Sequence, residues 1–255
     1  MKSCNLYKKV TKYSYTDESY RQMTLLSIVN EPWIVEDSLT NAIRWRQRYR
    51  KRRRRDFGQR GIIPREQSLY NNTVGLIGEF IFDGLLDRLN DEKGVSHYWA
   101  KPYYPPDDPR SKRTYDFDIY DFGKIEIKTI APISECERLL ISKEGCERSE
   151  ADYVIGLKLY YKNGMLMELN EVKTLDWNEH LLRSVYDAMF VGWLSEEELE
   201  ELDTAEPDSD EWCKESCYWT FIDRVKASKN KIHPLNSTIG FWKKLEEEVD
   251  IALFP

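Results

Sequence analysis

The sequence predicts an α/β fold in which helices flank a mixed β-sheet, with a basic helical extension at the N-terminal end. One long segment with helical spacing precedes a group of short strand-like runs, and further helical and strand-like segments alternate after them. A chain of 255 residues is long enough for one sizeable hydrophobic core. We place that core in residues 68–255, because Gly58, Gly61 and Pro64 end the basic region of residues 1–67.

The clearest predicted helix covers residues 72–90. Its apolar residues recur at helical spacing over a wide arc, so we expect it to be buried on much of its circumference. These residues are Val74, Ile77, Phe80, Ile81, Leu85, Leu86 and Leu89. The segment also contains Gly75, Gly78 and Gly84, and each glycine costs a helix about 1 kcal/mol relative to alanine. Three such losses indicate that the helix backbone packs closely against a neighbour or lies at a functional site. The alternative is that the helix simply tolerates the three glycines.

The other elements follow from shorter patterns. Alternation of apolar and polar residues predicts strands at 115–120, 124–130, 153–161 and 217–226, and more weakly at 1–16. Helical patterns predict helices at 17–30, 34–56, 178–191, 195–203 and 240–250. Ser195 followed by Glu198 has the spacing of a capping box, which places the start of the short acidic helix.

Composition excludes several classes of protein. No stretch approaches the ~18 consecutive apolar residues of a membrane-spanning helix, and no apolar run follows the first residues, so we expect a cytoplasmic, reducing setting. The five cysteines lack a Cys-x-x-Cys pair, which favours free thiols over disulfides, zinc or a cluster. The three histidines are isolated and there is no glycine-rich phosphate loop, so neither a His-based nucleophile nor a nucleotide cofactor is expected.

Charge is distributed very unevenly along the chain. The net charge of −7 argues against a nucleic-acid partner, but residues 41–66 hold eleven basic and two acidic residues, a net of +9. The rest of the chain therefore carries −16, and residues 195–211 contain ten acidic residues and no basic one. A concentrated basic segment on an otherwise acidic chain is typical of a protein that binds a polyanion.

Ten of the eleven basic residues in this segment are arginine, and Trp45, Tyr49 and Phe57 lie between the charges. Guanidinium groups bind phosphate oxygens through two parallel hydrogen bonds and stack on bases. The predicted nucleic-acid-binding residues are Arg44, Arg46, Arg48, Arg50, Lys51, Arg52, Arg53, Arg54 and Arg55. The alternative is a solvated helix face or a nuclear-import-like patch that makes no such contact.

Polar residues that could carry chemistry are concentrated in residues 115–130. This segment predicts two strands joined by a three-residue turn, Asp121 to Gly123, whose glycine supplies the left-handed conformation of such turns. Because side chains alternate along a strand, Asp116 and Asp118 face the same side of the hairpin.

The expected register pairs acidic residues across the two strands. It places Asp118 opposite Glu126 and Asp116 opposite Lys128, with Cβ atoms about 4.5–5.5 Å apart. Two carboxylates directly opposite each other repel, and a bound divalent cation removes that penalty, because hard oxygen ligands suit Mg²⁺. The alternative is an exposed hairpin in which these residues form ordinary surface ion pairs.

This arrangement resembles the PD-(D/E)XK nuclease superfamily, which has the restriction-endonuclease-like fold. In that superfamily an Asp ends one strand, and the next strand carries Glu or Asp, any residue and Lys, as in Asp118 followed by Glu126-Ile127-Lys128. A Glu often lies on the preceding helix, where this chain has Glu79. A helix and a strand follow the motif, and residues 134–149 and 153–161 could fill those places.

The resemblance covers about residues 70–170 and departs from the family pattern at one position. Phe117, not proline, precedes Asp118. Many members lack that proline, but its absence leaves Asp116 as a competing metal ligand. We prefer Asp118, because it faces Glu126 in the expected register.

The resemblance implies a role for each residue of the motif. Asp118 and Glu126, with the Ile127 carbonyl, would ligate Mg²⁺ or Mn²⁺, which lowers the pKa of bound water and polarises the phosphoryl oxygen. Glu79 would complete the metal's shell or hold a metal-bound water, unless it is a solvated residue at the edge of its helix. Lys128 would orient or help deprotonate the attacking water and stabilise the phosphorane charge.

The sequence therefore predicts a Mg²⁺-dependent DNA nuclease, of the endonuclease type, that hydrolyses phosphodiester bonds. Cleavage of both strands would favour a homodimer, and no membrane partner is expected. The alternatives are a non-catalytic DNA-binding module on the same fold and an RNA-directed nuclease.

Overall fold

The structure is a computed structural model, and it describes residues 10–14, 22–27, 32–51, 65–93, 99–100, 115–133, 137–161, 166, 186–206, 216–237, 240–245 and 247. Its strands are β1 (Val10–Ser14), β2 (Gln22–Ser27), β3 (Trp99–Ala100), β4 (Phe117–Ile119), β5 (Gly123–Ile130), β6 (Arg138–Ser142), β7 (Tyr153–Tyr161), β8 (Tyr186–Ser195), β9 (Asp203–Ala205) and β10 (Cys217–Phe221). Its helices are α1 (Pro32–Lys51), α2 (Arg65–Lys93), α3 (Lys143–Arg148), α6 (Glu196–Leu199) and α7 (Arg224–Lys229). Residues 240–245 are also helical.

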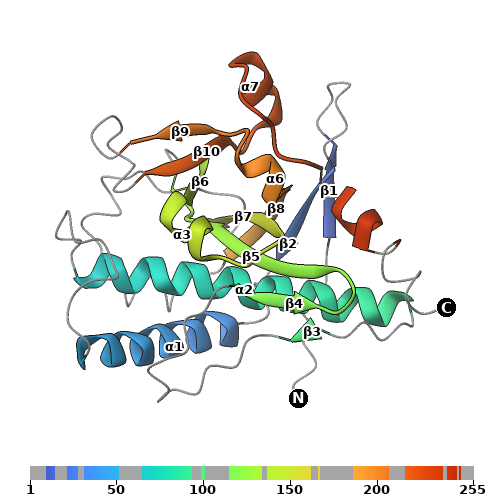
Figure 1. Cartoon of the computed structure of the whole chain (residues 1–255). Helices are drawn as coiled ribbons and strands as arrows, with labels where there is room; N and C mark the ends of the chain where they lie inside the picture. Colours follow the sequence, from blue (N-terminus) through green and yellow to red (C-terminus); the bar gives the residue numbers. More distant parts are fainter. Residues whose placement is uncertain are drawn as a thin grey trace.

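The strands form two sheets, which confirms the prediction of a mixed α/β protein (Figure 1). The larger sheet has seven strands in the order β1-β2-β8-β7-β5-β4-β3, and the smaller has three in the order β6-β10-β9. In the large sheet β5 and β7 run parallel, whereas its other neighbouring strands are antiparallel. The connection between the parallel pair contains β6 and α3, so the small sheet begins inside this crossover.

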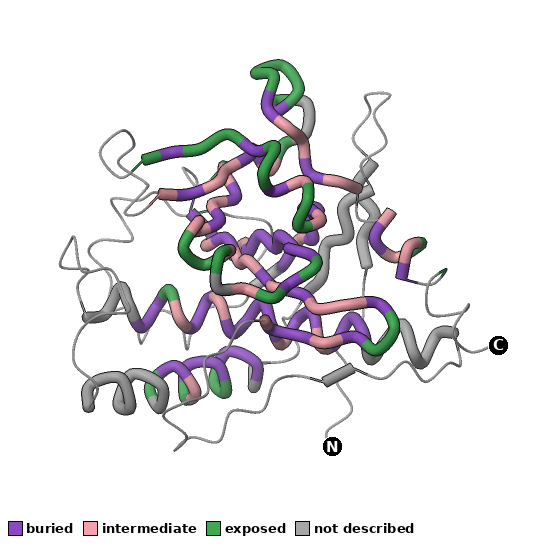
Figure 2. The backbone as a smooth tube through the Cα atoms, in the orientation of Figure 1, coloured by how far each residue is buried: buried purple, intermediate pink, exposed green. Residues whose placement is uncertain are grey.

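Helices α1 and α2 lie together along one face of the large sheet, and the small sheet with α3 and α6 lies over the other (Figure 1). The buried residues divide in the same way: one core joins Ile77 of α2 to Ile125 and Ile127 of β5, and another joins Val154 to Leu139 of the small sheet. Figure 2 shows the central strands as the most continuously buried part of the chain. Strand β5 therefore presents alternate residues to two different layers.

Helix α2 confirms and extends the predicted helix at 72–90, and one of its glycines has a packing role. A Cβ atom at Gly78 would lie 1.8 Å from Thr129 Oγ1, so only glycine permits the close approach of α2 to β5. A Cβ atom at Gly75 would meet nothing within 4 Å. The Gly75 carbonyl oxygen accepts a hydrogen bond from Thr129 Oγ1 at 3.5 Å, so both glycines lie over the same point of β5.

Two predicted helices are strands in the structure. Residues 17–30 contain β2, and residues 178–191 overlap β8. Pairing with strands far away in the sequence selects the strand conformation in both cases. β8 hydrogen-bonds to β7 on one side and to β2 on the other. An apolar run of this length suits a buried strand or a buried helix equally, and the neighbouring strands select between them.

Other predictions hold in part. Residues 217–226 form β10 followed by α7, and the place expected for a helix at 134–149 contains β6 as well as the short helix α3. The capping box at Ser195 is confirmed, because the Glu198 carboxylate accepts the Ser195 N–H at 2.8 Å. Helix α1 overlaps the predicted helix at 34–56.

The boundary expected at residue 67 falls inside α2, and β1 and β2 belong to the large sheet. The N-terminal region therefore adds strands to the core as well as a helix. No helix within the described part of the chain is long and apolar enough to span a membrane.

Candidate active site

The predicted hairpin is formed by β4 and β5, but its register differs from the expected one. The observed pairs are Phe117 with Ile125 and Ile119 with Gly123, so Asp118 lies opposite Lys124 rather than Glu126. The expected pairing of Asp118 with Glu126 is therefore wrong. The shift amounts to two positions, which leaves every side chain on the face where alternation places it.

Burial of a turn residue explains the shift. Phe122 is 7% exposed, and its ring stacks on Tyr153 at a centroid distance of 4.8 Å and packs edge-on against Phe241 at 5.5 Å. Its N–H donates to the Ile119 carbonyl at 3.0 Å, which closes the turn one residue earlier than expected. Asp121 takes the left-handed conformation, with φ of 62°. Packing of one aromatic ring thus sets the pairing of the acidic residues.

Asp116, the competing ligand, is the acidic residue that lies beside Glu126. Its backbone N–H donates to the Ile125 carbonyl at 2.8 Å, and its Oδ2 accepts the Ile127 N–H at 2.7 Å. These bonds hold Asp116 against the backbone on both sides of Glu126. The Asp116 residue is only 6% exposed, so its carboxylate is buried within the hairpin.

Lys128 and Glu126 form an ion pair on the face of β5 that points away from α2. Lys128 Nζ lies 2.5 Å from Glu126 Oε1, and the side chains are 29% and 22% exposed. Burial of the amine lowers the pKa of Lys128, but the carboxylates of Glu126 and Asp116 outweigh this effect, and the pKa is raised. The structure therefore brings Asp116, Glu126 and Lys128 together, and the amine holds its proton firmly.

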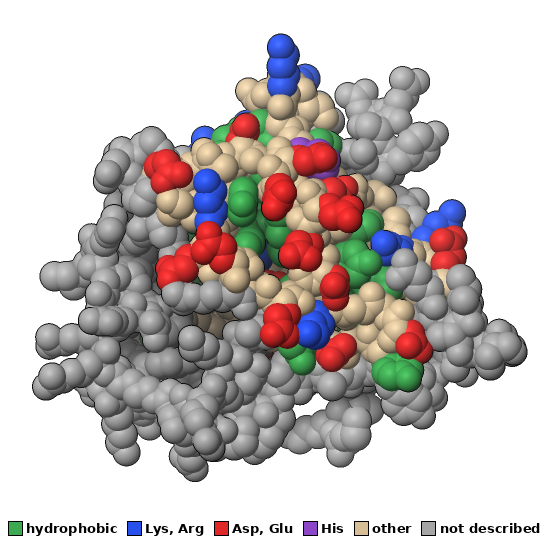
Figure 3. Space-filling model, viewed as in Figure 1, with side chains coloured by type: hydrophobic (Ala, Val, Ile, Leu, Met, Phe, Trp, Pro, Cys, Tyr) green, Lys and Arg blue, Asp and Glu red, His purple; other side chains and the backbone are tan. Residues whose placement is uncertain are grey.

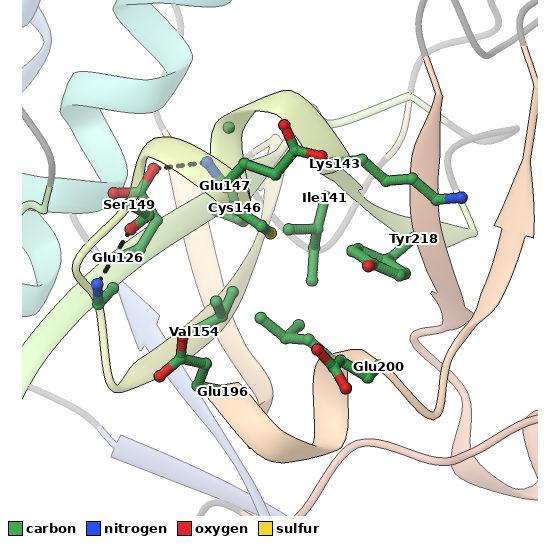
Figure 4. A pocket seen from close by; sticks show the side chains of 14 residues that line it. Glu126, Ile141, Lys143, Cys146, Glu147, Ser149, Val154, Glu196, Glu200 and Tyr218 are labelled. Atoms are coloured by element: carbon green, nitrogen blue, oxygen red, sulfur yellow. Dashed lines mark hydrogen bonds and ion pairs between the residues drawn. The ribbon is translucent and has the colours of Figure 1, made fainter.

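Glu126 and Lys128 open onto a cavity of about 170 Å³ between the two sheets (Figure 4). Tyr218 of β10 lies across the cavity from Glu126, Lys143 of α3 extends past it with Nζ 5.3 Å from the Tyr218 ring centroid, and Glu196 of α6 lies below Glu126. Ile141, Val154 and Leu199 also line the cavity. The motif thus lies at the wall of a small chamber with apolar and acidic sides.

Cys146 of α3 also lines this cavity, whereas the sequence predicted a free thiol there and gave it no place in the site. Burial raises the pKa of the Cys146 thiol, while the ammonium of Lys128 lowers it and the carboxylate of Glu126 raises it. Cys146 and Cys217 are free thiols in the structure, and the other three cysteines lie outside the described residues. Sequence spacing could not have placed Cys146, Glu196 and Tyr218 here, because each comes from a different element.

Glu79 does not line the cavity. It is a buried residue of α2, 6% exposed, and α2 packs against the face of β5 that carries Ile125 and Ile127. Glu126 and Lys128 point to the opposite face. Among the described residues no three Asp, Glu, His or Cys side chains are close enough together to hold a metal ion. The expected third carboxylate is therefore not part of the group that the structure assembles.

The predicted nucleic-acid-binding arginines lie mostly beyond what the structure describes. Residues 44–51 continue the backbone of α1, but their side chains are outside the described set, as are residues 52–55 entirely. Ile127, the expected carbonyl ligand, has a side chain that is 6% exposed in the core.

Comparison of the chain with protein-family models, with curated proteins and with solved structures finds no match.

Proposed function

We propose that this protein is a Mg²⁺-dependent nuclease that hydrolyses phosphodiester bonds in DNA. The observation that carries the proposal is the junction of Asp116, Glu126 and Lys128 on neighbouring strands beside a cavity. Two carboxylates and an amine close together are the groups that metal-assisted phosphate chemistry needs, and here a buried carboxylate lies beside a partly buried ion pair.

The order of elements also supports a restriction-endonuclease-like core. The long helix α2 precedes β3, β4 and β5, and α3 and β7 follow the motif strand. This is the order that the resemblance to PD-(D/E)XK nucleases implies. Asp116 takes the place of Asp118 in that pattern, one strand before Glu126-Ile127-Lys128.

The residues present fit a Mg²⁺ ion held by two carboxylates. Protein Mg²⁺ sites commonly use one or two carboxylates and complete the shell with water and substrate phosphate oxygens, so a cage of three side chains is not required. Asp116 and Glu126 would hold the ion, and Glu126 would exchange its contact with Lys128 for one with the metal. When bound, the ion would polarise the phosphoryl oxygen and lower the pKa of a coordinated water.

The raised pKa of Lys128 narrows its role in the proposed reaction. An amine that holds its proton so firmly does not deprotonate water at neutral pH. It donates hydrogen bonds instead, to the attacking water or to the phosphate oxygen on which negative charge develops. In the absence of metal, Glu126 pairs with the amine at the wall of the cavity, and once Glu126 holds the ion the amine would be free to reach the substrate.

Plasmid nicking in the presence and absence of Mg²⁺ or Mn²⁺ tests this function. The intact chain should convert supercoiled DNA to the nicked form only with metal. Lys128→Met should lower the rate by about 100-fold or more, the loss typical of removing one transition-state donor. Asp116→Asn should be similarly impaired and Asp118→Asn should not. The proposal would be refuted if the intact chain nicked the plasmid equally with and without metal, if it did not nick the plasmid at all, or if Lys128→Met kept full activity.

One observation favours a second candidate, a DNA-binding module without chemistry. Both carboxylates already have protein donors, Asp116 at the Ile127 N–H and Glu126 at the Lys128 amine. The module predicts binding of DNA that is independent of Mg²⁺, with no nicking. Parallel assays on duplex DNA, single-stranded DNA and RNA would also identify an RNA-directed nuclease.

A further inference from the structure

The segment 223–231 is strongly basic in a chain that is acidic overall. It contains Arg224, Lys226, Lys229 and Lys231 against one acidic residue, Asp223, whereas the whole chain has 45 acidic and 38 basic residues. Asp223 caps α7, because its carboxylate accepts the Lys226 N–H at 2.8 Å. We call residues 223–231 the basic tip, since they lie at the top of Figure 1, and basic side chains are visible there in Figure 3.

The basic tip has its own apolar anchor, so its lysines face outward. Ala227 and Ile232 are 0% and 6% exposed and pack against Phe221 at the end of β10. The Ile232 N–H donates to the Ala227 carbonyl at 3.0 Å, which folds the chain back after the helix. Lys229 and Lys231 lie at this reversal of the chain and are exposed. Their charges are thus held on a small ordered element rather than on a loose chain end.

Strand β10 connects the basic tip to the candidate active site. Tyr218 lines the same cavity as Lys128, and the strand ends at Phe221, shortly before α7. Arg224 is the sixth residue after Tyr218, so the two lie at most about 20 Å apart in extended chain. Backbone phosphates of one DNA strand advance about 3.4 Å along the helix axis per base pair, so this distance corresponds to at most about six base pairs.

Cationic groups continue along the outer face of β10. The Arg138 guanidinium carbon lies 4.4 Å from the centroid of the Trp219 ring, and Lys226 Nζ lies 4.8 Å from that of Phe221. Lys226 also pairs with Glu137, so one acidic charge at this face is already matched. Arg138 and Lys226 therefore place two cationic groups between Trp219 and the basic tip, on the face of β10 opposite to Tyr218.

We propose that the basic tip is a second phosphate-contact surface, which binds the backbone of duplex DNA within about six base pairs of the candidate active site, on one side of it. The inference rests on the proposed function for its ligand and goes beyond it by adding a contact distinct from the arginine-rich segment. The partner is chosen by charge complementarity: lysines on a projecting ordered element suit the evenly spaced phosphates of a duplex.

The dependence of DNA affinity on salt tests this surface, with EDTA present to prevent cleavage. The double variant Lys229→Gln/Lys231→Gln should reduce the slope of log affinity against log salt by about 1.8, because each phosphate contact contributes about 0.9. Lys229→Arg/Lys231→Arg preserves both charges and should preserve the slope. Lys243→Gln, which removes an exposed lysine elsewhere in the chain, is the matched control and should leave the slope unchanged.

Cleavage near the end of a duplex provides a second readout. The intact protein should cut poorly within about six base pairs of one end, where the tip has no phosphate to bind, and the double glutamine variant should lose this discrimination. An unchanged salt slope in the glutamine variant refutes the proposal that the basic tip contacts phosphates, and it leaves the proposed nuclease function unaffected. Failure of the intact protein to bind DNA at all overturns both. Thermal unfolding of each variant verifies that α7 remains folded.

Discussion

The carboxylate of Asp116 accepts the backbone N–H of Ile127 across two neighbouring strands, with Oδ2 2.7 Å from the nitrogen. The bond fixes a buried acidic group against the strand that carries Glu126 and Lys128. It also satisfies a backbone donor that β4 leaves open where its ladder ends. One side chain therefore has a structural partner and a position within the proposed site.

Asp116→Ala should destabilise the protein by about 1–3 kcal/mol, because it leaves the Ile127 N–H buried without an acceptor. Asp118→Ala, at a half-buried position opposite Lys124, should change the free energy of unfolding by no more than about 0.5 kcal/mol. Urea unfolding of both variants measures the difference. Equal destabilisation by the two variants would show that the hydrogen bond from Ile127 to Asp116 does not contribute to the free energy of unfolding.

The raised pKa of Lys128 predicts a contribution to stability that depends on pH. A basic group whose folded pKa exceeds its unfolded value stabilises the folded state fully below the unfolded pKa, about 10.4 for lysine. This stabilisation is lost as pH rises through the folded pKa. The difference in unfolding free energy between the intact protein and Lys128→Met should therefore shrink as pH rises above about 10.4. A difference that grew in that range would contradict the assigned direction.

Glu126→Gln isolates the cause of that shift. Burial lowers the pKa of Lys128, and the Glu126 carboxylate is the main group that raises it. Removing its charge should therefore lower the pKa of the amine relative to the intact protein. Side-chain NMR of the lysine as a function of pH measures this value, with Asp118→Asn as the charge-matched control. A pKa that did not fall would mean that Asp116 alone keeps the amine charged.

Two glycine substitutions in α2 should act in opposite directions. Gly78→Ala places a Cβ atom 1.8 Å from Thr129 Oγ1, and overpacking of this kind costs about 1–3 kcal/mol. Gly75→Ala meets nothing within 4 Å and should stabilise the helix by up to about 1 kcal/mol. Thermal or urea unfolding compares the two. Stabilisation by both would mean that α2 does not approach β5 as closely as the structure shows.

Alkylation of Cys146 should respond oppositely to the two charged neighbours. The thiolate is the reactive form, and Lys128 lowers the pKa of this thiol while Glu126 raises it. Lys128→Met should therefore slow modification by iodoacetamide, and Glu126→Gln should accelerate it. Peptide mass spectrometry follows the rate at Cys146, with the buried Cys217 as an internal reference. Changes of the same sign in both variants would argue against the charge effect.

Local pattern predicted the parts of the fold that depend on local chemistry. The apolar arc of α2, the capping box at Ser195 and the alternation in β5 all appear where periodicity placed them. The identity of β8 was missed because its apolar run acquires strand geometry only from its pairing with β2 and β7. Sequence alone carries no record of those partners.

The candidate site was predicted in its residue types and face, but not in its pairing. Alternation placed Asp116, Glu126 and Lys128 on one side of the hairpin, and the structure has them together. The choice between Asp116 and Asp118 depended on the register, which Phe122 sets by packing on Tyr153. Phe122 was assigned to the turn, and its burial could not be foreseen without the aromatic core around it.

The three-residue turn of the hairpin, Tyr120 to Phe122, limits how this segment can change length. Adding or removing one residue there would move every side chain of β5 to the opposite face of the sheet. Ile125 and Ile127 would then face the cavity, and Glu126 would face the hydrophobic core under α2. Adding or removing two residues would keep each side chain of β5 on its present face. It would change only which residue of β4 lies opposite Glu126. Natural variation at this loop should therefore come in even steps.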